Sequence, residues 1–368
     1  MKSLVDSVIS AAEQEQQKKS PESFRALIAE DEELERILQG LKTSIKIIGC
    51  GGGGSNTINR LAEAGIVGAE LYAANTDAQH LLMTRAPHKI LLGRRVTRGL
   101  GAGALPQVGE EAAREAEEEL KAALKDADIV FITCGLGGGT GTGAAPFAAQ
   151  IAKEHGALTV AICTWPFAAE GAIRAENAEW GLERLRTIAD TVIVIPNDRL
   201  LEIVPKLSVN AAFKVADEVL MRSIKGITEV VTKPGLVNLD FNDIKTIMKS
   251  GGVAMIGLGE SDDDDAAVVA VNEAISSPLI EMDIHEATAA LVNVTGGPSM
   301  TVTQAEQVAE VLQSKISPGA RIIWGAAIDE TLENTIRVMV VITGVKSKHI
   351  LGPARNRKGR DLGLDFIK

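Results

Sequence analysis

Nine residues near the middle of the chain, Gly135 to Gly143, have the composition of a loop that could hold the phosphates of a nucleotide. They read GLGGGTGTG and follow a short apolar run, 128–134, that is typical of a buried parallel strand. The apolar pattern after them, 144–152, is typical of a helix. Backbone N–H groups and the helix dipole at such a turn favour an anion, and glycine lets the backbone approach it closely. We therefore interpret the segment as a phosphate-binding loop rather than a flexible linker.

The side chains of this loop limit how it can neutralise a phosphate. Thr140 and Thr142 supply hydroxyls that can bind phosphate or a metal-bound water, and the loop contains no lysine or arginine. A bound polyphosphate must then rely on N–H groups, the helix dipole and a divalent cation, for which we expect nucleotide-bound Mg²⁺ and no metal site built by the protein itself. A β-branched side chain at Gly139 or Gly141 is expected to block the phosphate with the fold retained.

A second glycine-rich turn follows the first predicted strand, 45–48. Gly49, Gly51 and Gly54 satisfy the GxGxxG pattern in its strand–turn–helix context, and Asp77 lies about where a dinucleotide-binding fold places its ribose-binding acid. This leaves an NAD-dependent oxidoreductase open as an alternative. Such an enzyme has no evident use for the second, richer glycine loop, however. The sequence contains no GxxxxGK[ST] pattern, which disfavours a Walker-type ATPase.

Composition narrows the class of protein further. The 368 residues are 45% hydrophobic, enough for two domains with cores of their own. A formal charge of −11 and only 3% aromatic residues argue against nucleic-acid binding. Cys50, Cys134 and Cys163 form no CxxC pair and follow strand-like runs, so we expect buried free thiols in a reducing cytoplasm. No signal peptide and no apolar run of transmembrane length is recognised, so direct membrane insertion is not expected.

The order of predicted elements indicates the fold. Over 41–207, buried strands alternate with helices, and glycine or polar loops follow the strands, which predicts an α/β fold with a doubly wound parallel, Rossmann-like sheet and a ligand at the carboxyl ends of the strands. A long apolar-periodic helix, 208–231, comes next. A smaller α+β domain is predicted over 232–345. An N-terminal helical extension, 1–40, and a flexible tail, 346–368, complete the chain.

The sequence GGGTGTG at 137–143, placed after an apolar strand, resembles the signature of the tubulin/FtsZ family of GTPases. The resemblance extends to most of the chain, including IWGA at 323–326 and VVITG at 340–344, and points within the family to FtsZ cell-division proteins of an archaeal kind. It implies that 41–207 is a GTP-binding domain, that GTP and GDP are the bound nucleotides, and that the enzyme hydrolyses GTP to GDP and phosphate.

The resemblance also implies which residues contact the nucleotide. Glu170 and Arg174 match positions that contact ribose and phosphates, the base stacks near Phe213, and Asn197 and Asp217 match guanine-contacting positions. A carboxylate can accept both N1–H and N2–H₂ of guanine, whereas adenine has no such donor pair. The complete predicted set is Gly52, Gly53, Gly54, Ser55, Asn56, Asn75, Asp77, Gly101, Ala102, Gly103, Gly138, Gly139, Thr140, Gly141, Thr142, Gly143, Glu170, Arg174, Asn197, Phe213 and Asp217.

Simpler structural interpretations stay open for three of these assignments. The loop at Gly101–Gly103 is either a sensor of the terminal phosphate or an ordinary surface turn. Glu170 and Arg174 are spaced as an i,i+4 surface pair, worth a few tenths of a kcal/mol. Asp217 is either a guanine contact or a capping or solvated carboxylate.

The segment NLDFND at 238–243 matches the NxDFxD loop of the family. Asp240 and Asp243 lie three residues apart at a helix start, so both carboxylates can face one side, although Asp240 alone reads as an N-cap. In the family, this loop of the opposing subunit completes the catalytic site, which assigns catalysis to Asn238, Asp240 and Asp243. A contact between two different patches, repeated head to tail, gives open filaments.

The resemblance therefore predicts a cytoplasmic GTPase that polymerises with itself and scaffolds the division ring at mid-cell during septation. Division or membrane-anchoring proteins are expected to bind the tail, which ends in LGLDFIK at 362–368. Two alternatives from other classes are the NAD-dependent oxidoreductase and a nucleotide-regulated cytoskeletal polymer with little hydrolysis.

Overall fold

The computed structural model describes residues 43–203, 209–232, 235–237, 239–249, 252–263, 265–280, 284 and 287–344. The predicted N-terminal extension at 1–40, the predicted tail at 346–368 and the predicted catalytic residue Asn238 lie outside the described residues.

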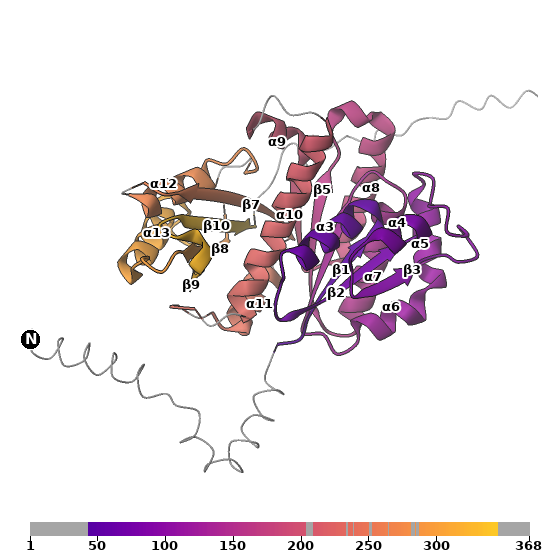
Figure 1. Ribbon diagram of the computed structural model, residues 1–368, viewed down its shortest axis with the longest axis horizontal. Helices are drawn as coiled ribbons and strands as arrows, with labels where there is room; N and C mark the ends of the chain where they lie inside the picture. The colour runs from indigo at the N-terminus through magenta and orange to yellow at the C-terminus, as the bar shows by residue number, and fades with distance from the viewer. Residues whose placement is uncertain are drawn as a thin grey trace, which may run out of the picture. The chain divides into compact units, whose positions relative to one another are not determined.

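Six parallel strands form the first part of the sheet, in the order β3-β2-β1-β4-β5-β6 (Figure 1). They are β1 (Ile45–Cys50), β2 (Ala69–Asn75), β3 (His88–Leu91), β4 (Ile129–Gly135), β5 (Leu158–Trp165) and β6 (Thr191–Pro196). The strand order reverses between β1 and β4, so the turns that follow these two strands leave the sheet on opposite faces at one point. Ligands of open α/β sheets bind at such a switch point. The predicted doubly wound parallel sheet is confirmed.

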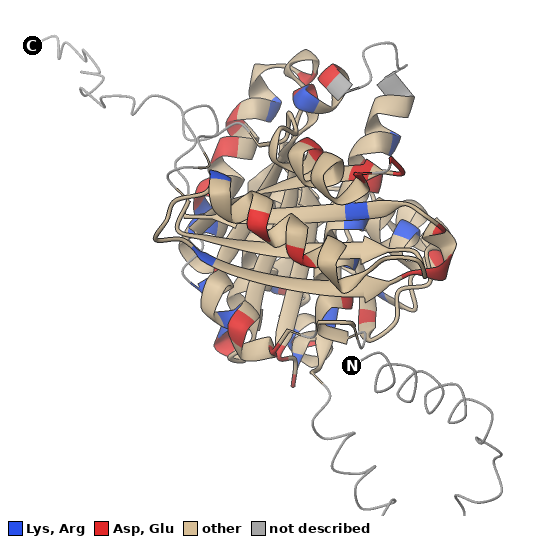
Figure 2. Cartoon of the chain, turned by 90° about the vertical axis from the view of Figure 1, so that its left-hand side faces the viewer, with Lys and Arg blue, Asp and Glu red and all other residues tan. Residues whose placement is uncertain are grey.

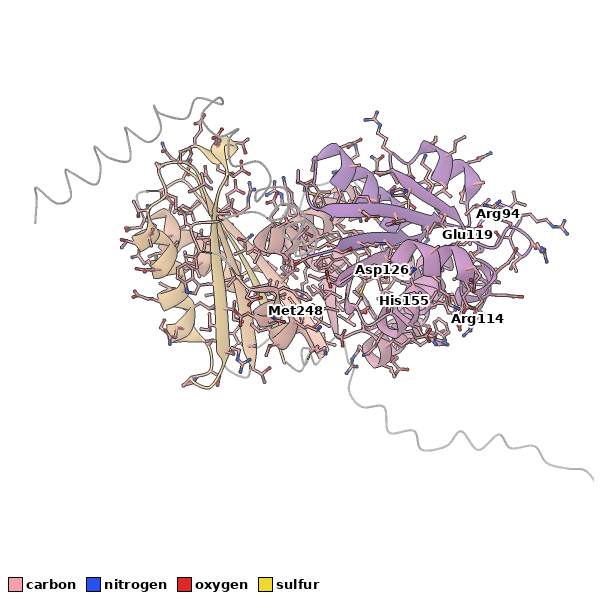
Figure 3. The ribbon with its side chains drawn as sticks, turned by 90° about the horizontal axis from the view of Figure 1, so that it is seen from below. Arg94, Arg114, Glu119, Asp126, His155 and Met248 are labelled. Carbon is pink, nitrogen blue, oxygen red and sulfur yellow. The ribbon has the colours of Figure 1, made fainter. Side chains whose placement is uncertain are left out.

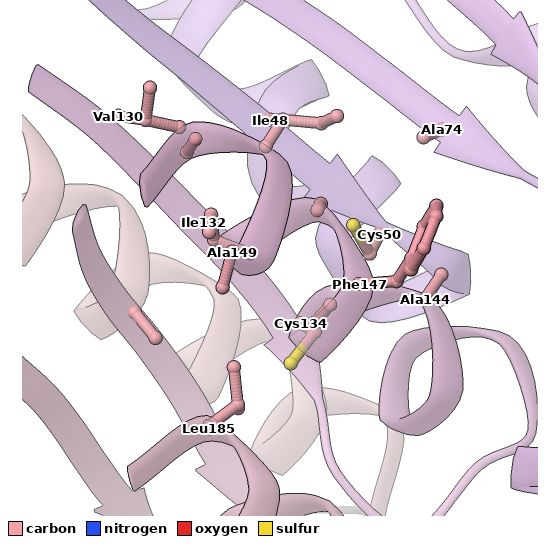
Figure 4. Close-up of a cluster of buried hydrophobic side chains, with 14 of the residues drawn as sticks. Ile48, Cys50, Ala74, Val130, Ile132, Cys134, Ala144, Phe147, Ala149 and Leu185 are labelled. Carbon is pink, nitrogen blue, oxygen red and sulfur yellow. The ribbon is translucent and has the colours of Figure 1, made fainter. Parts of the chain in front are cut away.

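Helices cover both faces of these strands. They are α3 (Gly51–Glu63), α4 (Ala78–Met83), α5 (Pro106–Glu115), α6 (Glu117–Leu124), α7 (Thr140–Glu154), α8 (Ala172–Ile188) and α9 (Asn197–Ile203), with a short 3₁₀ turn η2 (Ala168–Glu170). On one face, Ile48, Val130 and Ile132 of the strands share a core with Phe147 and Ala149 of α7 (Figure 4). The alternate strand residues belong to a second core with α3. Burial on both faces explains why these strands are almost continuously apolar.

A long helix and a smaller group of elements complete the described fold. The helix α10 (Val209–Thr232) has 24 residues and agrees with the predicted helix to within one residue at each end. The remaining elements are α11 (Phe241–Lys249), β7 (Gly252–Ser261), α12 (Ala266–Ile275), β8 (Ala289–Gly296), α13 (Val302–Lys315), β9 (Arg321–Ile328), η4 (Glu330–Leu332) and β10 (Ile336–Thr343). Leu220 and Ile224 of α10 share a core with Ile47 of β1 and Met339 of β10, so α10 packs across both parts of the sheet (Figure 1).

The sheet does not end where the predicted second domain begins. Residues 191–193 of β6 pair in parallel with 252–254 of β7, and the sheet continues as β7-β10-β8-β9. The β7–β10 and β10–β8 pairs are antiparallel, and β8–β9 is parallel. The proposed boundary at 232 therefore crosses a continuous ten-stranded sheet. Most strand residues are uncharged, and the charged side chains concentrate on helices and loops (Figure 2).

The glycine-rich turn after β1 is itself helical. The helix α3 begins at Gly51, so four glycines form its first turn despite their low helix propensity. A Cβ at Gly54 would lie 2.5 Å from the backbone oxygen of Thr133, which shows that glycine is needed for the close approach of α3 to β4.

This close approach predicts that a methyl group added at Gly54 destabilises the protein, whereas one added at Gly52 does not. Gly54→Ala is expected to lower the free energy of unfolding by about 1–3 kcal/mol, as overpacking does. Gly52→Ala is the matched control, because a Cβ at Gly52 meets no atom within 4 Å. Denaturant unfolding of the nucleotide-free proteins measures both. Equal stability of the two variants would contradict the packing argument.

Candidate functional site

The two glycine-rich turns meet at the switch point between β1 and β4. A Cβ at Gly51 would lie 2.6 Å from the backbone nitrogen of Gly141, and one at Gly53 would lie 3.2 Å from that of Gly135. The N-termini of α3 and α7 therefore converge. The first four N–H groups of a helix lack partners within the helix, so two such sets face one region. This arrangement can hold an anion larger than a single phosphate group.

The glycines of the site divide into open and crowded positions. A Cβ at Gly52, Gly101, Gly103 or Gly138 meets no atom within 4 Å. A Cβ at Gly139 would lie 2.8 Å from the backbone nitrogen of Leu105, and one at Gly141 would lie 2.8 Å from the backbone oxygen of Gly135. The expectation that a β-branched residue at Gly139 or Gly141 spares the fold is therefore wrong, because backbone atoms occupy that space.

The loop at 97–105 lies against the start of α7. The hydroxyls of Thr76 and Thr140 are 2.6 Å apart, and the N–H of Gly101 donates to the backbone oxygen of Thr76 at 3.2 Å. Ala102, predicted with its two flanking glycines, is buried beside Gly139. The loop thus has a fixed place beside the phosphate loop and is more than a surface turn.

Two residues that sequence reasoning missed hold this loop. Thr76 is fully buried and lies between the two predicted contacts of its segment. Asn177 of α8 donates its amide to the backbone oxygens of Ala104, at 3.0 Å, and Gly137, at 3.3 Å. Thr76 could have been suspected from its place after a strand, whereas nothing in the local pattern singles out Asn177.

The other end of the loop is attached to α5 and α6. The Glu115 carboxylate accepts the N–H groups of Arg95 and Val96, and Arg94 forms an ion pair with Glu119 at 3.5 Å (Figure 3). The ion pair is well exposed, so the Glu115 hydrogen bonds to the backbone are the firmer attachment.

The predicted pair Glu170 and Arg174 lies at the rim of the phosphate loop. The two side chains form an ion pair, and Glu170 also accepts the N–H of Phe167 at 2.9 Å. A Cβ at Gly137 would lie 2.9 Å from the backbone oxygen of Arg174. The i,i+4 pair exists as the simpler interpretation states, and it adjoins the loop as the family resemblance implies.

Three residues could meet a flat polar ring: Phe167 before η2, Asn197 at the start of α9 and Phe213 in α10. Phe213 is 40% exposed, and its ring meets that of Phe167 edge to face with the centroids 5.1 Å apart. Asn197 is buried, and its side-chain oxygen has no hydrogen-bond partner among the described residues. An unpaired buried acceptor is a place where a ligand N–H group can bind.

Asp217 lies one helical turn after Phe213. Its side chain is only 17% exposed, and burial raises the pKa of the carboxyl from 3.8 to about 6, although Arg60 Nε lies 3.8 Å away and opposes the shift. A carboxylate that is poorly solvated and weakly paired gains most from a new pair of N–H donors. This fits the guanine edge that the resemblance assigns to it.

Some predicted contacts have structural roles in the described fold. Ser55 is fully buried, and its hydroxyl has no hydrogen-bond partner among the described residues. The hydroxyl of Thr142 accepts the N–H of Gly137 at 2.9 Å and shapes the turn. Asp77 caps α4 by accepting the N–H of His80 at 3.0 Å. Asn56 is exposed, and Asn75 is 3% exposed at the end of β2.

The structure does not bring the predicted catalytic carboxylates to this site. Asp240 and Asp243 are exposed, and Asp240 caps α11 by accepting the N–H of Asn242 at 3.0 Å. The α10 helix is about 36 Å long at 1.5 Å per residue. Asp217 lies in its first half, whereas the hydroxyl of its last residue, Thr232, donates to the backbone oxygen of Val67, just before β2. The carboxylate loop follows α10, so it lies toward the amino ends of the parallel strands, away from the glycine turns.

Three further observations concern thiols, metals and membranes. Cys50, Cys134 and Cys163 are buried and free, as predicted, and burial raises the pKa of Cys50 and Cys163 to about 12. Within the described ranges, no group of three or more His, Cys, Asp or Glu is arranged to hold a metal ion. Across the same part of the chain, no helix is both long and apolar enough to cross a bilayer.

Comparison with known proteins gives consistent matches over both halves of the chain. The Tubulin/FtsZ family GTPase domain matches residues 44–205, and the FtsZ family C-terminal domain matches residues 252–346. The cell division protein FtsZ 1 of Archaeoglobus fulgidus is 59% identical over 368 residues, which is 100% of both chains. That of Halobacterium salinarum is 61% identical over 322 residues, 88% of this chain and 81% of its own.

Solved structures agree with these matches. An empty FtsZ dimer of M. jannaschii has a TM-score of 0.83 at 56% identity, covering 86% of this chain and 92% of its own. The GDP-bound CetZ1 monomer of Haloferax volcanii has a TM-score of 0.73 at 22% identity, covering 84% and 98%, and shares the fold alone. No match supports the NAD-dependent oxidoreductase among the relatives compared, and that alternative is set aside.

Substitution of the open Gly138 is expected to weaken nucleotide binding and to leave the fold intact. Gly138→Ala places a methyl group in open space and in the proposed path of the phosphates. We expect the nucleotide dissociation constant to rise by about 10-fold or more, as for the loss of charge-assisted hydrogen bonds of roughly 1.5–3 kcal/mol. Equilibrium titration with GTP measures it, and Gly319→Ala, in a remote turn that is also open and has no positive φ, is the control. Unchanged affinity in Gly138→Ala would reject the phosphate cradle.

Because the pKa of Asp217 is raised, the Asp217→Asn substitution is expected to increase stability by an amount that depends on pH. Between the unfolded pKa of 3.8 and the folded pKa of about 6, the folded chain binds more protons, so its stability falls as pH rises, by up to about 3 kcal/mol at roughly 1.4 kcal/mol per unit. Asp217→Asn avoids this loss. Thermal melts of the nucleotide-free proteins should show a larger gain at about pH 7.5 than at about pH 5. The same gain at both pH values would contradict the assigned pKa.

Proposed function

Because the chain belongs to the FtsZ proteins of the tubulin/FtsZ family of GTPases, we propose that it hydrolyses GTP only when assembled into head-to-tail filaments. In this proposal, the glycine turns of one subunit bind the nucleotide, and the loop before α11 of the next subunit completes the active site. The filaments scaffold the cell-division ring.

The observation that carries this proposal is the separation of the two halves of the chemistry. The glycine turns lie at the carboxyl ends of β1 and β4, and Asp240 and Asp243 follow the far end of α10. Neither half is complete alone, because the carboxylates beside the glycine turns have other partners: Asp77 caps α4, and Glu170 pairs with Arg174. If the carboxyl ends of the strands in one copy stack on the amino ends of the strands in a second copy, the two halves of the site come together. Repetition of that contact gives a filament.

Exposed apolar side chains around the nucleotide edge favour such a contact. Leu100, Leu105 and Ile173 are 86%, 55% and 74% exposed. Leu105 occupies the N-cap position of α5, where a polar residue is usual, and makes no capping hydrogen bond. A leucine at this position gains by being covered, and a second copy of the chain would cover it.

Each part of the site has a defined task in hydrolysis. The N–H groups at the starts of α3 and α7 hold the phosphates, and Asn197 and Asp217 select guanine. The bound nucleotide brings Mg²⁺, which offsets charge on the phosphates in a loop without cations. Asp240 and Asp243 of the adjoining subunit orient the attacking water in line with the terminal phosphate and accept its proton.

The wider role rests on the relatives, which are named cell division proteins. We place the filaments at the mid-cell division site. Division or membrane-anchoring proteins would be recruited through the tail at 346–368. A polymer with little hydrolysis is the second candidate, favoured by the N-cap role of Asp240, which accounts for that residue without catalysis.

Hydrolysis that depends on the contact predicts that activity per subunit rises with protein concentration. Asp240→Asn keeps an N-cap side chain and removes the charge, so α11 is preserved. We expect it to bind GTP and sediment as polymers, with turnover lower by on the order of 10²–10³, as for other losses of a positioned acid or base. Phosphate release and sedimentation on the same samples measure both properties, with Asp262→Asn, another exposed acid, as the control.

Two results would decide against the shared site. One is activity per subunit that stays constant down to concentrations at which only monomers are present. The other is normal turnover in assembled Asp240→Asn, which would favour the alternative that Asp240 is only an N-cap.

A further inference from the structure

His80 of α4 connects two asparagines that flank the glycine turns. Its Nδ1 lies 3.2 Å from the amide nitrogen of Asn75, and its Nε2 lies 3.1 Å from the amide oxygen of Asn56. Asn75 ends β2, and Asn56 lies in the second turn of α3. We propose that His80 is a positioning residue, whose neutral Nε2–H tautomer orients both amides for the nucleotide. The inference rests on the proposed function, in which these asparagines contact GTP.

The direction of each hydrogen bond that links these side chains follows from one backbone N–H group. The N–H of Asp77 donates to Oδ1 of Asn75 at 3.3 Å, and a backbone N–H can only donate. The NH₂ group of Asn75 must then face His80. Since NH₂ can only donate, Nδ1 of His80 accepts, and the ring proton resides on Nε2. Nε2–H in turn donates to Oδ1 of Asn56, so each link fixes the next.

These hydrogen bonds determine which end of the Asn56 side-chain amide faces the ligand. With its oxygen engaged by His80, Asn56 has its two amide N–H donors free, and this residue is exposed just after the four glycines of α3. Phosphate and ribose oxygens are acceptors, so donors attract them, whereas the flipped amide would present its oxygen and repel them. His80 therefore controls the sign of the partial charge that Asn56 offers to the nucleotide.

The backbone of His80 is also held by hydrogen bonds. The N–H of His80 donates to Asp77 at 3.0 Å, and its backbone oxygen accepts from the hydroxyl of Thr84 at 2.9 Å. The α4 helix has only six residues, so these two bonds fix most of its length. A ring held at the backbone and at both nitrogens has one orientation, which a positioning role requires.

A tether between α3 and α4 is the simpler explanation and makes a different prediction. Loss of a tether lowers stability, and any side chain that restores packing repairs it. Loss of orientation lowers nucleotide affinity, and only a side chain with one acceptor and one donor repairs it. His80→Phe keeps a ring and removes both hydrogen bonds, whereas His80→Gln keeps an acceptor and a donor.

Nucleotide titration and steady-state kinetics of the full chain separate the two. We expect His80→Phe to raise the dissociation constant and KM for GTP about 10-fold, equivalent to roughly one or two hydrogen bonds, with kcat at saturating GTP within about 2-fold. His80→Gln should recover most of the affinity. His88→Phe is the control, because His88 stacks on Tyr72 with the centroids 4.7 Å apart and phenylalanine keeps that contact. Unchanged affinity in His80→Phe, or equal affinity in the Phe and Gln variants, would overturn the inference.

Asn56→Ala distinguishes failure of this inference from failure of the site. If Asn56→Ala binds GTP normally, Asn56 is no nucleotide contact and the proposed function loses this part of its site. If Asn56→Ala weakens binding and His80→Phe does not, only the inference about His80 fails. In the double variant, adding His80→Phe to Asn56→Ala should cost far less than in the unchanged chain, and full additivity would reject the hydrogen-bonded chain.

Discussion

The close backbone approach at the switch point between β1 and β4 is the constraint on which the rest of the site depends. A Cβ at Gly51 or Gly54 would lie within 2.6 Å of a backbone atom of another segment. Without side chains at these positions, α3 and α7 can start at the same place and direct their free N–H groups to one region. The site thereby binds an anion with backbone groups and without a cation in the loop, which leaves part of the phosphate charge to the nucleotide's own metal ion.

The base side of the site holds polar groups in a state that the free protein does not favour. Asp217 is ionised in a poorly solvated place, and the oxygen of Asn197 is buried without a partner. Both groups destabilise the empty protein, and both are relieved by a ligand that brings N–H donors. In the proposed site, part of the selectivity for guanine would therefore be present as strain before the nucleotide binds.

The long helix α10 determines how far apart the two functional regions lie. It carries Phe213 and Asp217 in its first half, packs across both parts of one continuous sheet, and ends near the start of β2, ahead of Asp240. A rigid helix of this length prevents the carboxylate loop from folding back onto its own nucleotide. In the proposed mechanism, this separation makes a second copy the source of the missing group and makes assembly a condition for hydrolysis.

The sequence by itself determined the parallel sheet, the glycine turns at the strand ends and the bounds of α10 to within one residue, because apolar periodicity and glycine-rich turns are local signals. The family resemblance added the base and carboxylate positions, whose roles stay predictions. Only the tertiary structure decided that α3 begins at Gly51, that Gly139 is crowded while Gly138 is open, that Ser55 is buried, and that Asn177 and His80 join the site. Each of these depends on contacts between segments distant in the chain, and a single glycine, asparagine or histidine has no periodicity that could announce such a contact.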